Sequence, residues 1–189
     1  MRTVIQELLT IGLNELGTKM KPELNRGTEH QVYSATHNPN IVYKVGDQEN
    51  VLRWYKIFKS NPEIFPRVFK IGELYDGRYY VTLEKLNVSQ VKNEWSDMDS
   101  ALELTGVVDN DVFEQTLMHV FIDLVLGYIP LTNVLAGLRD SHIIQLIKHW
   151  YEFLRKTYQY VKKFGLKGID INPGNYGYDN QGNLKALDI

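Results

Sequence analysis

The 189-residue chain contains no cysteine, which excludes disulfide bonds, cysteine nucleophiles and thiolate metal sites. It also lacks a long apolar run. The most apolar stretch, Val120 to Leu131, is too short to span a bilayer and is interrupted by Asp123 and Pro130. The N-terminal residues do not follow a signal-peptide pattern, because polar side chains interrupt their apolar positions. These absences predict a reducing compartment and a cytoplasmic location.

A strong charge of either sign is missing as well. Lysine and arginine number 21 against 23 aspartate and glutamate, so the net charge is only -2. This balance gives no bulk attraction to nucleic acid or to an anionic membrane, and we predict neither as a partner. The composition, 43% hydrophobic and 23% charged, is typical of a globular chain with a real core.

Hydrophobic periodicity and turn residues predict a strand-rich half followed by a helical half. In the first half, a helix is expected over Val4 to Gly17, strands over Gln31–Ala35 and Ile41–Val45, a helix from Asp47 to Lys59, and strands over Val68–Leu74 and Arg78–Leu83. In the second half, amphipathic helices are expected over Val112–Leu126 and Ser141–Phe164. The sequence therefore predicts the α+β class.

The last stretch, Gly168 to Ile189, carries the most chemical information. Asp170 and Asn175 flank a Pro-Gly turn, and a predicted hairpin then leads to Asp188. Carboxylate and amide oxygens brought together in this way are suited to hold a hard cation such as Mg²⁺ against a polyphosphate. The alternative is structural, because the same residues form good turns in any protein.

The spacing of this stretch resembles the protein kinase-like superfamily, especially its Rio-type and antibiotic phosphotransferase members. In that superfamily an aspartate is followed five positions later by asparagine and then by a metal-binding aspartate at the end of a hairpin. The resemblance implies that Asp170 orients the acceptor hydroxyl and takes its proton. It also implies that Asn175 and Asp188 hold Mg²⁺ on the phosphates of ATP.

The resemblance also implies a two-lobe fold. Residues 1–85 would form a β-rich small lobe with one helix, and residues 86–189 a shortened, mostly helical large lobe. The chain ends one residue after Asp188, where Asp-Phe-Gly is the family pattern, so we expect a large lobe truncated after its metal-binding aspartate. Such a lobe would expose apolar surface, which predicts a protein partner or a second copy of the chain as its cover.

Three residues of the strand-rich half are predicted to contact the nucleotide or to support that contact. Gly27 lies where a phosphate-covering loop is expected, although an ordinary turn is the alternative. Lys44 falls on an apolar strand face, where its ammonium group needs an anion such as phosphate; the alternative is a lysine that reaches water. Glu49 is the first choice as its ion-pair partner, or else a helix-start glutamate favoured by the macrodipole.

Glu84 and Leu86 follow a predicted strand and occupy the expected hinge, where backbone groups would bind adenine. The leading functional prediction is a phosphotransferase that binds ATP and Mg²⁺ and transfers the γ-phosphoryl group to a hydroxyl of a protein or a small molecule. The main alternative is a catalytically inactive binding or inhibitory module. Gly168, Ile169 and Asn172 favour it, because they replace the His-Arg pair and the lysine of active protein kinases. A purely structural component of an assembly is a third reading.

Overall fold

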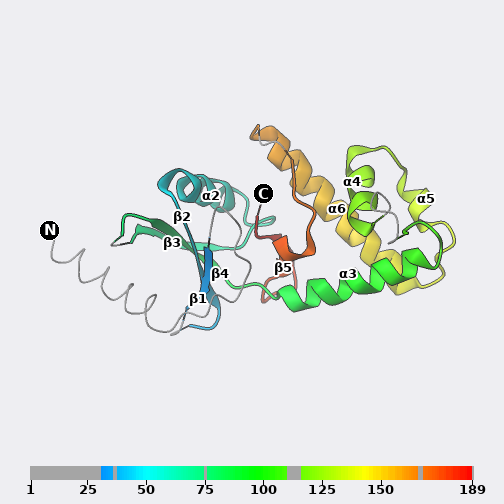
Figure 1. Ribbon diagram of the computed structural model, residues 1–189, viewed down its shortest axis with the longest axis horizontal. Helices are drawn as coiled ribbons and strands as arrows, with labels where there is room; N and C mark the ends of the chain where they lie inside the picture. The colour runs from blue at the N-terminus through cyan, green and yellow to red at the C-terminus, as the bar shows by residue number, and fades with distance from the viewer. Residues whose placement is uncertain (1–30, 36–37, 75, 110–115, 166–167, 189) are drawn as a thin grey trace. The chain divides into compact units, whose positions relative to one another are not determined.

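A computed structural model of the chain describes residues 31–35, 38–74, 76–109, 116–165 and 168–188. The chain divides into two compact units, Met1–Leu86 (unit 1) and Asn87–Ile189 (unit 2) (Figure 1). Unit 1 contains a four-stranded antiparallel sheet and a helix, whereas unit 2 is mostly helical, so the predicted α+β class is confirmed. The predicted N-terminal helix lies outside the described residues.

The sheet of unit 1 is built from the two predicted hairpins. Its strands are β1 (Gln31–Ser34), β2 (Ile41–Gly46), β3 (Val68–Glu73) and β4 (Tyr79–Glu84), in the spatial order β1-β2-β4-β3. The hairpins join because β4 pairs with β2 over the full length of both strands. At the second turn, Gly77 adopts a φ of 83°, a left-handed conformation that favours glycine.

Helix α2 (Gln48–Ser60) begins where its sequence predicts. The Asp47 carboxylate accepts a hydrogen bond from the Asn50 backbone N–H at 2.8 Å and so caps the first turn. The helix contacts β2, β3 and β4 (Figure 1). Its buried side chains recur at helical spacing and are Val51, Trp54, Ile57 and Phe58. Burial of this stripe fixes α2 against the sheet.

The helices of unit 2 are α3 (Val88–Glu103), α4 (Leu117–Leu126), α5 (Leu131–Leu135) and α6 (Ser141–Lys163). The structure confirms the predicted helix at α6 and the described part of the one at α4. Both α3 and α4 contact α6, and three aromatic rings meet at this junction: Trp95, Phe121 and Trp150. Within the described ranges, none of the helices combines the length and the apolarity needed to cross a membrane.

Unit 2 ends in the predicted loop and hairpin. A single 3₁₀ turn, η2 (Pro173–Asn175), is followed by the antiparallel strands β5 (Tyr176–Tyr178) and β6 (Leu184–Ala186). The helix α3 contacts both η2 and β5, and a backbone bridge joins Asn87, which caps α3, to Tyr178. The hairpin is therefore held directly against the helical part of its own unit.

Candidate functional site

The loop that carries the predicted catalytic aspartate is shaped by its own turn residues. The Asn172 side chain accepts a hydrogen bond from the Gly174 N–H at 2.9 Å, and the Asn172 carbonyl accepts one from the Asn175 N–H at 2.8 Å. Pro173 sits at the start of the 3₁₀ turn, where its missing N–H costs nothing. Ile171 is buried and anchors the loop to the core. Local chemistry therefore sets the path of the chain from Asp170 to Asn175.

Asp170 and Asn175 are in direct contact. The Asn175 Nδ2 donates to Asp170 Oδ2 at 2.8 Å, and the Asp170 side chain is otherwise exposed. Because its Nδ2 is held by the carboxylate, Asn175 has Oδ1 as the side-chain atom that would contact a cation. The structure thus brings together the residue predicted as the base and one of the two residues predicted to bind metal.

Asp188 is tied to the same loop through the backbone. The Leu187 N–H donates to the Asn175 carbonyl at 2.7 Å, so the chain segment that leads into Asp188 runs beside Asn175. Two carboxylates and an amide therefore belong to one hydrogen-bonded segment. Among the residues that the structure describes, no group of three or more His, Cys, Asp or Glu side chains is arranged to hold a metal. A cation here would rely on Asn175 and on the loop backbone as well as on carboxylates.

Tyr176 and Tyr178 are two buried tyrosines of β5 that the sequence did not mark as functional, and of the two hydroxyl groups only that of Tyr176 contacts the loop. The Tyr176 hydroxyl donates to the backbone carbonyl of Asp170 at 3.0 Å, and Tyr176 is only 1% exposed. The Tyr178 hydroxyl donates to Glu94 Oε2 at 2.7 Å. Since β5 alternates its faces, the pattern Tyr-Gly-Tyr places both phenols on one side. This alternation is the feature of the sequence from which the shared orientation of the two tyrosines could have been predicted.

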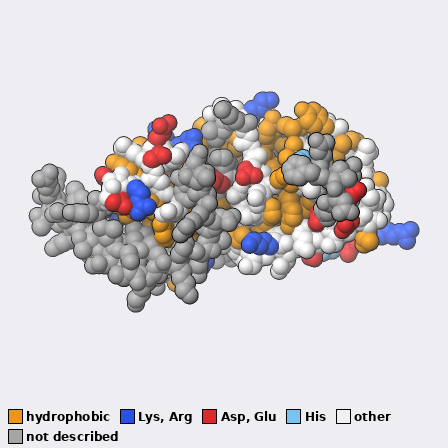
Figure 2. Space-filling model, viewed as in Figure 1, with side chains coloured by type: hydrophobic (Ala, Val, Ile, Leu, Met, Phe, Trp, Pro, Cys, Tyr) orange, Lys and Arg blue, Asp and Glu red, His pale blue; other side chains and the backbone are white. Residues whose placement is uncertain are grey.

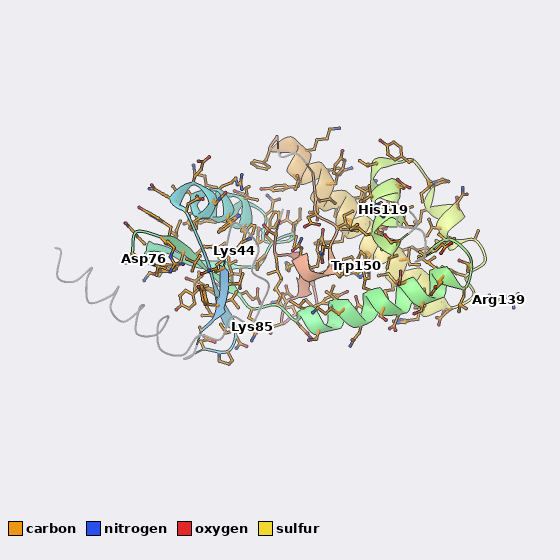
Figure 3. The ribbon with its side chains drawn as sticks, in the orientation of Figure 1. Lys44, Asp76, Lys85, His119, Arg139 and Trp150 are labelled. Carbon is orange, nitrogen blue, oxygen red and sulfur yellow. The ribbon has the colours of Figure 1, made fainter. Side chains whose placement is uncertain are left out.

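Glu94 collects hydrogen bonds from three elements of unit 2. Its carboxylate accepts from Tyr178 in β5, from the Trp150 Nε1 in α6 at 3.1 Å and from the Gln90 Nε2 in α3 at 3.0 Å. Burial raises the pKa of Tyr178, and the Glu94 carboxylate raises it further. The phenol therefore stays protonated and keeps donating. Trp150 belongs to α6, and its ring makes an edge-on contact with Tyr176 of the hairpin (Figure 3).

The hairpin turn is closed by a second carboxylate. Asp179 accepts from the backbone N–H groups of Gln181 and Asn183 and lies 3.5 Å from the Lys185 ammonium. Burial disfavours its charge, but the hydrogen bonds from Asn183 and Gln181 and the charge of Lys185 prevail and lower the pKa of Asp179. This ionised turn fixes the register of β5 and β6.

Lys44 lies on the face of β2 opposite Tyr43 and Val45, as the strand alternation predicts, and this face is turned toward α2. Tyr43 and Val45 join a cluster on the other face, whereas the Lys44 ammonium lies 4.2 Å from the ring centroid of Trp54 and 5.8 Å from that of Phe58 (Figure 3). Lys44 is 2% exposed, so the alternative of a lysine that reaches water does not hold. Aromatic faces stabilise a partly desolvated ammonium group.

The remaining predicted nucleotide contacts lie in unit 1 or outside the described residues. Glu49 is exposed in the first turn of α2, and its ion pair with Lys44 stays a prediction. The Glu84 N–H donates to the Arg67 carbonyl, so it already has a partner within the sheet. Leu86 is buried at the end of unit 1. Gly27 falls outside the described residues.

Large apolar side chains reach the surface of unit 2. Figure 2 shows hydrophobic side chains gathered around α6 on the visible face, and the exposed ones of this unit include Leu126, Tyr128 and Phe164. The predicted covering partner, whether another protein or a second copy, stays a prediction.

Comparison with known proteins gives no family model and no curated protein that matches the chain. Solved structures do match at the level of shape. The GDP and kanamycin complex of the aminoglycoside phosphotransferase APH(2″)-IIIa has 11% identity and a TM-score of 0.37, covering 96% of this chain and 71% of that one. The GDP complex of the wild-type aminoglycoside 2'-phosphotransferase-IIIa has 12% identity and a TM-score of 0.35, covering 97% and 71%.

The apo form of a thermostable mutant of APH(4)-Ia has 13% identity and a TM-score of 0.35, covering 96% of this chain and 70% of that one. Likeness at this level carries no information about activity. These solved structures, to which the chain is similar at 11 to 13% identity and TM-scores of 0.35 to 0.37, are aminoglycoside phosphotransferases.

Proposed function

We propose that the chain is a kinase-like phosphotransferase that binds ATP with Mg²⁺ and transfers the γ-phosphoryl group to a hydroxyl of a protein or a small molecule. One observation carries the proposal. The 2.8 Å hydrogen bond from Asn175 Nδ2 to Asp170 Oδ2 joins two polar groups of the type this reaction needs, and the Leu187 N–H ties Asp188 to the same loop. Phosphoryl transfer depends mainly on positioning and on charge stabilisation, which such a loop can supply.

In the proposed reaction Asp170 acts as the general base. The acceptor hydroxyl oxygen attacks the γ-phosphorus while its proton passes to a carboxylate oxygen of Asp170. The bond between the γ-phosphorus and the oxygen that bridges it to the β-phosphorus breaks, and ADP leaves. Exposure of the Asp170 side chain leaves it accessible to an acceptor. Its contact with Asn175 restricts the orientation of the carboxylate.

Asn175 Oδ1 and the Asp188 carboxylate are the side-chain groups proposed to hold Mg²⁺. Both are hard oxygen ligands of the kind that Mg²⁺ prefers. Bound there, the cation would neutralise charge on the nucleotide phosphates. Asn175 would then serve both the base and the cation, because its Nδ2 donates to Asp170 and its Oδ1 is proposed to contact Mg²⁺.

Lys44 is proposed to contact nucleotide phosphate. Lys44 is buried, and its ammonium group lies beside the aromatic side chains of α2. Glu49 is proposed as its ion-pair partner, Gly27 as part of the phosphate-covering loop, and the backbone at Glu84 and Leu86 as the adenine-binding segment. Each of these assignments can be tested by a separate substitution.

A non-catalytic kinase-like module is the second candidate. The position two residues after Asp170 is Asn172, whose side chain caps the 3₁₀ turn and brings no positive charge. The transferring phosphoryl group would therefore lack one cation that assists active protein kinases. In this reading the chain binds a nucleotide or a partner without turnover.

Nucleotide binding and turnover separate the two candidates. ATP with Mg²⁺ is expected to raise the melting temperature (Tm) by roughly 5 to 10 °C at about 100 times Kd, because it binds the folded state. In Asp170→Asn this rise should persist while the formation of ADP falls by about 10²- to 10⁴-fold. Asp97→Asn is the matched control, since Asp97 is an exposed carboxylate in α3.

A wild type that binds ATP with Mg²⁺ but shows no turnover with water, serine peptides or small polyols would favour the module. A melting curve indifferent to nucleotide would argue against both candidates.

A further inference from the structure

Asp170 is held at its backbone as well as at its side chain. The Tyr176 hydroxyl donates to the Asp170 carbonyl at 3.0 Å, and the Asn175 amide donates to the Asp170 carboxylate at 2.8 Å. The two bonds come from consecutive residues and close the same loop at its far end. With only the side-chain bond, the carboxylate would keep its partner but the chain beneath it would be less restrained.

We propose that Tyr176 is the positioning residue of Asp170, an inference that rests on the proposed function. Its phenol fixes the backbone from which the catalytic carboxylate projects. A proton-transfer group has to be held to within a fraction of an ångström of its working position. Tyr176 itself does not contact the reacting atoms, because its hydroxyl is buried and engaged with the Asp170 backbone.

The Tyr176 ring is held by α6, the longest described helix of the unit. It makes edge-on contacts with Trp150 at 5.4 Å and Phe153 at 6.1 Å between ring centroids. The Trp150 indole is oriented in turn by its hydrogen bond to Glu94 of α3. Edge-to-face packing of this kind restricts both the tilt and the translation of the ring. Through these contacts, the helices α3 and α6 fix the position of the Asp170 backbone.

The phenol remains a donor over the whole neutral range. Burial raises the pKa of Tyr176, and the nearby Asp170 carboxylate raises it further. The O–H group therefore keeps its proton where phosphoryl transfer is expected to operate. A charged phenolate beside the Asp170 carbonyl would repel it and release the loop.

The same strand offers a matched control. Tyr178 is also a buried tyrosine of β5 with a hydrogen-bonded hydroxyl, but its partner is Glu94 and not the Asp170 loop. Replacing either tyrosine by phenylalanine removes one oxygen and keeps the ring. A general loss of buried hydrogen bonding would affect both variants, whereas loss of positioning affects only Tyr176→Phe.

The test compares the full-length wild type, Tyr176→Phe and Tyr178→Phe in three measurements. These are the Tm with and without ATP and Mg²⁺, the steady-state formation of ADP, and amide hydrogen exchange over residues 170–176. In Tyr176→Phe we expect kcat to fall roughly 10- to 100-fold, with KM for ATP and the nucleotide-dependent rise in Tm unchanged. Exchange at the Gly174 and Asn175 amides should speed up. In Tyr178→Phe we expect a lower Tm with wild-type kcat and wild-type exchange in the loop.

Equal losses of kcat in both variants, or wild-type kcat and loop exchange in Tyr176→Phe, would overturn the inference. A wild type without turnover would count against the phosphotransferase and not against the positioning. The exchange difference between the two variants would then decide the positioning alone.

Discussion

The side-chain amide of Asn175 lies 2.8 Å from the carboxylate of Asp170, across a turn that the Asn172 side chain caps. This contact pairs a neutral donor with an exposed carboxylate. The amide nitrogen of Asn175 is thereby occupied, and its Oδ1 is the side-chain atom that remains for the proposed contact with a cation.

Asp188→Ala tests the cation assignment. Removing this carboxylate should abolish the rise in Tm that ATP produces with Mg²⁺, because the cation would lose one of its proposed ligands. The measurement is a thermal melt with ATP, with and without Mg²⁺. Asp97→Ala should behave as the wild type. An undiminished Mg²⁺-dependent rise in Asp188→Ala would remove this residue from the metal site.

Lys44→Met tests the phosphate assignment in unit 1. Methionine keeps the apolar stem against Trp54 and Phe58 but removes the charge, so the folded state should lose the cation–π stabilisation, which is about 2 kcal/mol for a desolvated ammonium group. The affinity for ATP, measured by titration calorimetry, should fall by at least about tenfold, equivalent to about 1.4 kcal/mol. The matched control is Lys59→Met, because the Lys59 ammonium also lies over an aromatic ring, that of Tyr55 in α2. Equal affinities of Lys44→Met and the wild type would contradict the assignment.

Asp179→Asn tests the closed turn through its pH dependence. The folded-state pKa of Asp179 is lowered, so its ionised form stabilises the fold above the ordinary carboxyl range, and that contribution is lost as the pH falls through the lowered pKa. Urea unfolding at pH 7 should show Asp179→Asn to be less stable by about 1 to 3 kcal/mol. The difference should shrink toward zero as the pH falls through the lowered pKa of Asp179. A difference independent of pH would mean that packing, not charge, is what the substitution removes.

Glu94→Ala tests the hydrogen bonds behind the hairpin. The substitution leaves the Trp150 N–H and the Tyr178 O–H without their described acceptor, so we expect a loss of about 2 to 4 kcal/mol in the free energy of unfolding. Denaturant unfolding measures it. Glu103→Ala, at the end of the same helix, should cost less than about 0.5 kcal/mol. Near-equal stability of the two variants would show that water replaces the Glu94 carboxylate.

The parts of the fold that could be predicted are those governed by neighbours in the chain. The Asp47 cap, the helix that follows it and the hairpin after Tyr176 depend on turn and capping residues within a few positions. The joining of the two hairpins by β2 and β4 was not predicted, because pairing of distant strands depends on tertiary contacts. Helix α3 was not delimited, since its buried side chains Val91, Met98 and Leu102 are too sparse to mark a stripe.

The candidate site also contains residues that local sequence predicts and residues that only distant contacts bring together. Asp170, Asn175 and Asp188 were found from their spacing, which a local loop preserves in space. The support from Glu94 could not be found, because its contact with Tyr178 spans 84 residues. No pattern in the sequence connects two such distant polar side chains. Tyr176 is intermediate, because its alternation with Tyr178 is visible but its bond to the Asp170 carbonyl is not.

The ammonium of Lys44 lies against the indole of Trp54, which is the one tryptophan among residues 1–86 of a chain that contains three. Replacing Trp95 and Trp150 by phenylalanine would leave Trp54 as the sole source of tryptophan fluorescence. Its emission would then respond to any ion that draws the lysine headgroup away from the ring. The intrinsic fluorescence of Trp54 would therefore report on the position of the Lys44 ammonium group without an added label.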